Sequence, residues 1–235
     1  MAALVVAALG LIGCGAGTSA PAPVAGPSSF PVLTLPAVTT APPPLQTVPL
    51  GPAPTLAPGS AVVVVAGTGF DVTGGLEGPV YRADECHSRK GVGGSPLPDP
   101  VCTPGAVSGQ VTQSGLASTI CGSGDYATSV QPPASVTGPF TDFELQVYGI
   151  ASPDPGYRLD ELVPLDLGGA SDTRNLWVVT DEIALARARV DNGLHGLVCG
   201  AVSGGPTVPL ALAQRLVAAD WTTALAQATA AETGG

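Results

Sequence analysis

The sequence predicts an α+β domain in which a β-hairpin is followed directly by a long helix, a ββα arrangement, with a further helix near the C-terminus. Three observations predict this fold class. Two apolar, β-compatible runs, Leu162–Leu167 and Leu176–Val179, flank a Gly-rich loop. A helix-start signal follows the second run at Thr180. Four cysteines in the charged part of the chain indicate loops held by disulfides.

The N-terminal part differs sharply in charge from the rest. All 18 acidic and 8 basic side chains lie at or after Asp71, so residues 1–70 carry none. Residues 1–14 are expected to form a lipoprotein signal peptide, because their apolar run is too short to span a bilayer. The run ends in Leu-Ile-Gly-Cys, which resembles the bacterial lipobox, so Cys14 would be lipidated and bind the membrane. An ordinary signal peptide with an incidental cysteine is the alternative.

A tether and then a globular domain are expected to follow. Residues 15–60 are rich in Pro, Ala and Thr and have no charge or periodicity, which predicts an extended, disordered tether. Residues 61–235 are expected to fold as one domain. Its first run, Ala61–Ala66, is β-branched and predicts a strand, although the sequence leaves open whether residues 61–69 pack on the domain.

Cysteine usage agrees with export to an oxidising compartment. Cys86, Cys102, Cys121 and Cys199 allow three disulfide connectivities. We favour Cys86–Cys102, which closes a Gly/Pro-rich loop, and Cys121–Cys199, which joins the start of the domain to its long helix. A four-thiolate zinc site is the rival, but the sequence has no Cys-x-x-Cys pair.

The helices are predicted from caps and spacing. Thr180 is a suitable N-cap, and two acids follow it, so a helix is expected from there to about Val198, ending near Gly200. A second helix is expected from near Pro209 to about Ala230. Asp142–Tyr148 fits either a short helix or a strand. The expected buried positions of the two long helices are Ile183, Leu194, Leu197 and Val198, then Leu210, Ala213, Val217 and Trp221.

One motif carries a family resemblance. Residues 157–169 read Tyr-Arg-Leu-Asp-Glu-Leu-Val-Pro-Leu-Asp-Leu-Gly-Gly, and Asn175-Leu176-Trp177 follow. This pattern resembles the core of bacterial secreted HNH-type endonucleases, which have a ββα-metal fold. Weaker matches extend the resemblance over about residues 99–225. They are the stretches 102–106, 119–121, 124–126, 130–133, 148–149, 194–200, 213–214 and 220–221.

The resemblance implies site residues and also a defect. HNH chemistry uses a histidine as general base, a divalent metal and an asparagine that orients the base. Asp160 takes the family's metal-side position and Asn175 its asparagine position, whereas Glu161 stands where the histidine is normal. An exposed glutamate, with a pKa near 4.3, would be a weak base for water. In the purely structural alternative, one carboxylate is solvated and the other pairs with Arg158 or Arg187.

Other positions depart from the family in the same direction. The helix has Arg187, Ala188 and Asp191 where the family has Lys, Asp and Glu, and Gln131 replaces an Arg. His195 is expected to pack or cap rather than bind metal, and His87 to be solvated. The net charge of −10 makes nucleic acid a poor partner, because binding to phosphates relies on Lys and Arg.

Three functions therefore stay open. The first is a lipoprotein of the bacterial cell envelope with a catalytically inactive, HNH-like domain, a pseudoenzyme that binds a protein or cell-wall partner and needs no cofactor. The second is a metal-dependent nuclease in which Glu161, or a base acting through water, replaces the histidine. The third is a divalent-cation module that binds Mg²⁺, Mn²⁺ or Zn²⁺ through Asp160, Glu161 and Asp191. We favour the first, and with it a chain that is not an enzyme.

Overall fold

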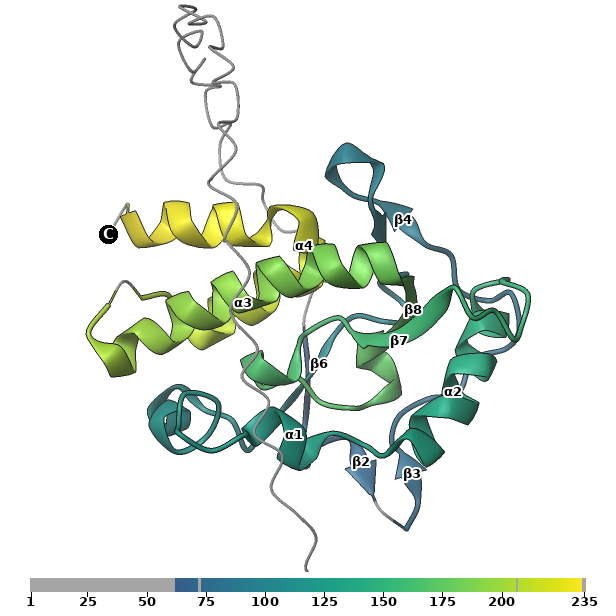
Figure 1. The fold of residues 1–235 in the computed structure, drawn as a ribbon, viewed down its shortest axis with the longest axis horizontal. Helices are drawn as coiled ribbons and strands as arrows, with labels where there is room; N and C mark the ends of the chain where they lie inside the picture. Colours follow the sequence, from purple (N-terminus) through teal and green to yellow (C-terminus); the bar gives the residue numbers. More distant parts are fainter. Residues whose placement is uncertain (1–61, 72, 206, 234–235) are drawn as a thin grey trace, which may run out of the picture. The chain divides into compact units, whose positions relative to one another are not determined.

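A two-stranded antiparallel hairpin stands at the centre of the domain (Figure 1). The computed structural model describes residues 62–71, 73–205 and 207–233. Strand β7 (Tyr157–Glu161) pairs with β8 (Leu176–Thr180), and helix α3 (Asp181–Ser203) begins at the next residue. The α+β class and the order hairpin then helix are thus as predicted. The predicted signal peptide over 1–14, Cys14, the tether over 15–60 and Ala61 lie outside the described residues.

The predicted first strand of the hairpin is wrong. Leu162–Leu167 was the expected strand, but β7 ends at Glu161 and the apolar run continues as a loop that closes in a 3-10 turn, Leu165–Leu167. Pro164 has no N–H to give to a ladder, which disfavours a strand here. The run is apolar because it is packed inside the protein, with Leu162, Val163 and Leu167 all buried. Asp160 and Glu161 consequently lie at the end of the strand.

Helix α3 begins and ends at the kinds of residue that its sequence predicted. The Thr180 side chain accepts a hydrogen bond from the Ile183 N–H, and two acids lie in the first turn. The helix continues past the expected end at Gly200 and stops at Gly204, which has a left-handed φ of 77°. Leu194 and Val198 are buried, as expected, whereas Ile183 and Leu197 are only partly buried.

Helix α4 (Leu210–Thr233) is interrupted where the sequence predicted a continuous helix. Asp220 has φ −160° and ψ 96° inside it, and its carboxylate accepts hydrogen bonds from the Thr222 N–H and hydroxyl. Asp220 therefore acts as an N-cap for the second half of the helix. Its four predicted buried positions are confirmed.

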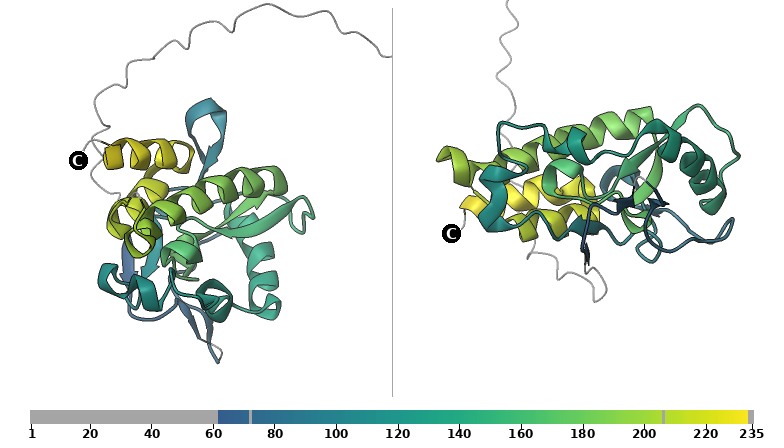
Figure 2. Two further views of the ribbon diagram at one scale, coloured as in Figure 1. Left: turned by 60° about the vertical axis from the view of Figure 1, so that its left-hand side comes forward. Right: turned by 90° about the horizontal axis from the view of Figure 1, so that it is seen from below.

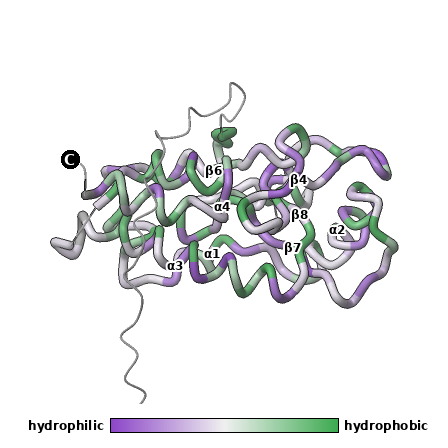
Figure 3. Tube along the Cα trace, turned by 90° about the horizontal axis from the view of Figure 1, so that it is seen from above, coloured by the Kyte–Doolittle hydropathy of each residue, from purple (hydrophilic) through white to green (hydrophobic). Residues whose placement is uncertain are grey.

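The main hydrophobic core lies between the hairpin, α3 and α4, and the two helices run side by side (Figures 1 and 2). Trp177 of β8 and Trp221 of α4 are 1% and 4% exposed within it. The colour along the chain changes repeatedly in Figure 3, so hydrophobic and hydrophilic residues alternate within elements. This alternation gives α3 and α4 one buried side each.

Two helices precede the hairpin. Helix α1 (Tyr126–Val130) is short, and α2 (Ala134–Val147) contacts both β7 and β8. The segment 142–147, for which helix and strand were both open, is helical. The arrangement sets α2 and α3 against the same hairpin.

The remaining strands are short and form three further pairs. Strand β1 (Val63–Val65) lies parallel to β6 (Ala106–Ser108), so the strand expected within 61–66 does pack on the domain. The other elements are β2 (Phe70–Asp71) with β3 (Gly75–Leu76), β4 (Arg89–Lys90) with β5 (Pro96–Leu97), and 3-10 turns at Val92–Gly94, Gln113–Ser118 and Thr173–Asn175.

Both favoured disulfides are present. Cys86–Cys102 lies in a small buried cluster with Val147, and Cys121–Cys199 ties the Gln113–Ser118 region to α3. Disulfides of this kind indicate an oxidising, extracytoplasmic compartment. Among the described helices, none is long and apolar enough to cross a membrane.

Candidate functional site

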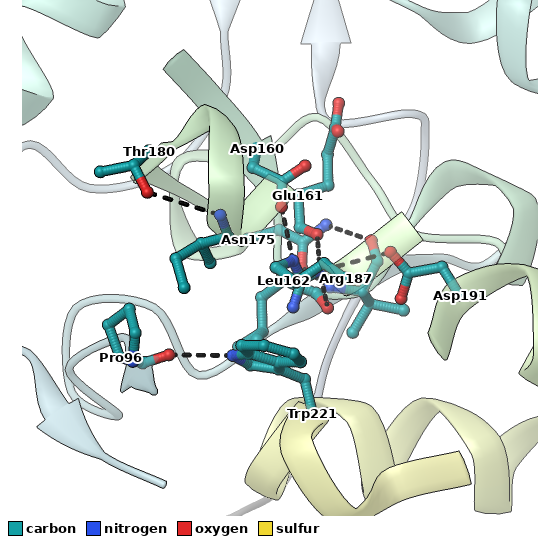
Figure 4. A network of polar contacts seen from close by, with 11 residues as sticks. Pro96, Asp160, Glu161, Leu162, Asn175, Thr180, Arg187, Asp191 and Trp221 are labelled. Carbon is teal, nitrogen blue, oxygen red and sulfur yellow. Dashed lines mark hydrogen bonds and ion pairs between the residues drawn. The ribbon is translucent and has the colours of Figure 1, made fainter. Parts of the chain in front are cut away.

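The end of β7 meets α3 through a buried arginine (Figure 4). Arg187 Nε donates to Asp160 Oδ2 at 2.5 Å, and Arg187 Nη2 donates to the carbonyls of Glu161 and Leu162 at 2.6 and 3.0 Å. The sequence had offered Arg158 as the other partner, but Arg158 lies 3.8 Å from exposed Asp181 instead. The predicted metal-side carboxylate, Asp160, is therefore held by a guanidinium.

Arg187 is one of the most completely buried side chains of the protein. It is 1% exposed, and its guanidinium carbon lies 5.8 Å from the Trp177 ring and 5.7 Å from the Trp221 ring. A buried charge is tolerated only when it is paired and hydrogen-bonded, and aromatic faces add cation–π attraction. Asp160, two carbonyls and two indoles supply these contacts. Nη1 is left without a hydrogen-bond partner among the described residues.

Asp191 is a second acid beside the same guanidinium. Its Oδ2 lies 3.8 Å from Arg187 Nη2, one helical turn away. Burial raises the pKa of Asp191 to about 7, although the charge of Arg187 opposes the rise. One guanidinium therefore faces two carboxyl groups, of which Asp160 makes the direct hydrogen bond.

Glu161 differs from the exposed carboxylate that the sequence suggested. Burial, and then the neighbouring charge of Asp160, raise its pKa to about 7. Figure 4 shows its carboxyl group turned away from the Arg187 guanidinium, with no contact drawn to it. The two adjacent acids therefore have different environments: Asp160 is ion-paired toward α3, whereas Glu161 is mostly buried without a charged partner.

Asn175 holds a loop. It is 0% exposed, its Oδ1 accepts from the N–H groups of Val163 and Ala106 at 2.8 and 3.2 Å, and its Nδ2 donates to the carbonyls of Val163 and Ala170 at 2.8 and 2.9 Å. These four bonds use the hydrogen-bonding capacity of the amide. Asn175 fixes the buried turn between β7 and β8, and no group of the Glu161 side chain is among its partners.

The three acids of the predicted cation module do not form a ready metal site. In the parts of the chain that the structure describes, Asp160, Glu161 and Asp191 are not among the groups of three ligand atoms within 4.8 Å of one another. The one group that meets this criterion there is Cys121, His195 and Cys199.

That Cys-His-Cys group has the ligand types that zinc uses. Its two sulfurs are joined as a disulfide, however, and metals bind the thiolate form. His195 Nε2 lies 2.9 Å from the Ile120 carbonyl oxygen and 3.3 Å from Cys199 Sγ. The packing role expected for His195 is thus observed. His87, as expected, is exposed.

A cleft of about 770 Å³ borders the other side of β7. It lies between all five residues of β7, the 153–155 segment and one face of α2. Four acids line it, namely Asp142, Asp154, Asp160 and Glu161, against a single base, Arg158. This cleft was not predicted from the sequence. The small residues Ala134, Gly138 and Thr141, spaced along one face of α2, were the signal that could have suggested an open groove there.

Glu144 is another residue that the sequence reading did not single out. It is 3% exposed on α2, and burial raises its pKa to about 8. The charge of Glu144 also helps to raise the pKa of the Tyr81 and Tyr148 hydroxyls. The only signal for it in the sequence is its position as an acid between two apolar residues, Phe143 and Leu145.

The geometry therefore combines a closed, ion-paired contact between β7 and α3 with an open, acidic cleft between β7 and α2. Comparisons of this chain with protein-family models, with curated proteins and with solved structures find no match. Function must consequently be argued from the site itself.

Proposed function

We propose that the chain is an exported lipoprotein whose domain is a non-catalytic binding module on an HNH-like ββα scaffold. The lipobox-like sequence before Cys14 and the uncharged segment 15–60 support an anchor and a tether. The two disulfides support an oxidising compartment. The hairpin followed by α3 supports the scaffold.

The Asp160–Arg187 pair carries the non-catalytic part of the proposal. Metal-assisted phosphodiester cleavage needs a carboxylate free to bind a divalent cation. Asp160 instead makes a direct hydrogen bond to a guanidinium that is 1% exposed and cannot leave without exposing its indole and carbonyl partners. A metal at Asp160 would have to compete with this cation at close range. Glu161, next to it, replaces the histidine base.

Electrostatics support the same proposal. The cleft beside these residues is lined by four acids and one base, and the chain carries a net charge of −10. A nucleic-acid backbone would be repelled by such a surface. A protein or cell-wall partner fits this charge better than a polynucleotide does.

One observation favours a second candidate, a metal-dependent nuclease that uses Glu161 as its base. A general base works best when its pKa lies near the working pH, and that of Glu161 is raised to about 7 in a residue that lines a cleft. In this candidate Glu161 would accept the proton of the attacking water. The candidate still requires Asp160 to exchange Arg187 for a metal.

A plasmid-cleavage assay separates the two candidates. The full-length mature protein is incubated with supercoiled DNA and Mg²⁺, Mn²⁺ or Zn²⁺, beside the variants Asp160→Ala and Glu161→Gln. The binding module predicts no conversion above the protein-free level in any sample. Conversion by the native protein that both variants abolish would overturn it and establish the nuclease.

A restoring variant sharpens the assay. The single variant Glu161→His keeps the ion pair between Asp160 and Arg187, so it is expected to stay inactive. Glu161→His combined with Arg187→Lys and Ala188→Asp brings positions 161, 187 and 188 to the residues of the resembled family and leaves Asp191 unchanged. Activity in the triple variant only would show that the residues of α3, and not residue 161 alone, block catalysis.

A further inference from the structure

The cleft beside β7 has the geometry of a strand edge that faces a helix. All five residues of β7 line it, although successive side chains of a strand point to opposite faces. Both faces can border one cleft only if the cleft runs along the edge of the strand. The opposite wall is α2, through Ala134, Thr137, Gly138, Thr141, Asp142 and Leu145, which are spaced as one helical face.

The backbone of β7 is unpaired in the middle of this edge. The Leu162 N–H donates to the Asn175 carbonyl at 2.7 Å, and hydrogen-bonded pairs alternate with non-bonded pairs in an antiparallel ladder. In the observed register, Leu159 and Val178 then form a non-bonded pair. The N–H and C=O of Leu159 consequently point away from β8. Outside the hairpin ladder, nothing in the described chain hydrogen-bonds to them.

The two ends of this edge are already closed by local contacts. Beyond Leu159 the Glu161 carbonyl accepts from Arg187, and before it the Tyr157 N–H donates to the Asp154 carbonyl. The open stretch is therefore centred on Leu159. Strand β7 spans about 17 Å at ~3.3 Å per residue, enough for an extended peptide of about five residues.

The charge of the walls indicates what kind of peptide would bind. Asp142 lies on α2, Asp154 in the segment before β7, and Asp160 and Glu161 at its end, so acids lie around the open stretch. Arg158, the only base of the lining, is near Asp181 on its other side. Asp160 is paired with Arg187, whereas Asp142 and Asp154 form no ion pair among the described residues, so complementary charge favours a peptide with basic side chains.

We propose that the α2–β7 cleft binds an extended peptide with basic side chains, which pairs with the free edge of β7 as an added strand. Such strand addition between a sheet edge and a helix is an established way for domains to recognise peptides. The cleft volume of about 770 Å³ suits a ligand of this size. The proposal rests on the proposed binding function and names its ligand class.

Fluorescence anisotropy with a labelled, end-blocked heptapeptide of alternating Arg and Val tests whether the cleft prefers basic peptides. The full-length mature protein is expected to bind it, and to bind an alternating Glu and Val peptide at least about tenfold more weakly. Asp142→Asn with Asp154→Asn should weaken binding of the Arg peptide about tenfold at low salt. The matched control, Glu77→Gln with Glu182→Gln, makes the same change of net charge outside the cleft and should leave the affinity within about twofold. Equal losses in both double variants would overturn the proposal, since they would show attraction to overall charge.

Amide hydrogen exchange tests the strand pairing directly. Saturating Arg peptide is expected to slow exchange of the Leu159 N–H, while the Arg158 and Asp160 amides, which face β8, change little. Binding without protection of Leu159 would overturn strand addition. A concentration-dependent dimer that protects Leu159 without peptide would show instead that a second copy fills the edge. None of these outcomes depends on DNA cleavage, so the proposed function and this inference can fail separately.

Discussion

The two sides of β7 are built in opposite ways. Toward α3, the Asp160 carboxylate is occupied by Arg187, which is buried between two indoles. Toward α2, the strand edge is open, unpaired at Leu159 and surrounded by acids. The Asp160 charge, which the motif would assign to metal binding, is therefore part of the protein's internal structure. The uncompensated charges lie where a ligand can reach them.

The largest effect on stability is expected at the contact between β7 and α3, the closed side of the strand. Arg187→Met should lower the free energy of unfolding by about 3 to 5 kcal/mol, because it leaves a partly buried carboxylate and two carbonyls without their donor. Urea unfolding at pH 7 measures this change. The control Arg158→Met removes an exposed ion pair and should cost less than about 1 kcal/mol. Similar costs for both would mean that the closed side is not held by Arg187.

Asn175 should come next. Asn175→Ala removes four hydrogen bonds to buried backbone groups and is expected to cost about 2 to 4 kcal/mol. Thermal and urea unfolding measure the loss. If the variant were as stable as the native protein, Asn175 would not have the structural role that its contacts indicate, and an active-site role would have to be reconsidered.

The pH dependence of stability tests the environment of Glu161. Its folded pKa, raised to about 7, lies above the unfolded value of 4.5. The unfolded chain therefore loses its proton first, and the stability that protonated Glu161 contributes is fully present below pH 4.5 and lost as pH rises through 7. The pKa of Asp191 is also raised, so its contribution to stability is likewise lost as pH rises.

Glu161→Gln should remove its share of that dependence. The variant is expected to be more stable than the native protein at pH 8 by on the order of 1 to 2 kcal/mol and similar to it at pH 4. Urea unfolding over pH 4 to 8 measures both curves. Parallel curves would show that Glu161 is solvated, and this would also remove the observation that favours the nuclease candidate.

The smallest effect on stability is expected in the α2–β7 cleft, the open side of the strand. Asp142→Asn with Asp154→Asn should change the free energy of unfolding by less than about 0.5 kcal/mol, because neither carboxylate forms an ion pair among the described residues. Its effect belongs to peptide binding instead. A large destabilisation would mean that these acids, like Asp160, serve the fold.

The sequence predicted what local chemistry determines. Thr180 and the two acids after it define the start of α3, and the spacing of the cysteines suggested both disulfides. It failed for Leu162–Leu167, because an apolar run reads the same whether it is a strand or a buried loop. The kink at Asp220 was also missed, since its side chain caps a helix from within.

Only part of the candidate site could be predicted from the sequence. Asp160, Glu161 and Asn175 could be named from their motif, but what surrounds them depends on residues far along the chain. Arg187 is 27 residues from Asp160 in sequence, and the raised pKa of Glu161 follows from burial that no local pattern encodes. The open edge at Leu159 depends on the register of β7 with β8 and on the position of α2.

The most direct test of the account is whether a metal can reach Asp160. Side-chain carboxyl signals are recorded by NMR in the full-length mature protein while Mn²⁺, which broadens nearby signals, is added to millimolar concentration. Occupation of Asp160 by Arg187 predicts that the Asp160 and Glu161 signals broaden no more than those of exposed acids such as Glu182. Selective broadening of Asp160 that Arg187→Lys enhances and Asp160→Asn abolishes would contradict it, because Asp160 would then be a metal ligand rather than the partner of Arg187.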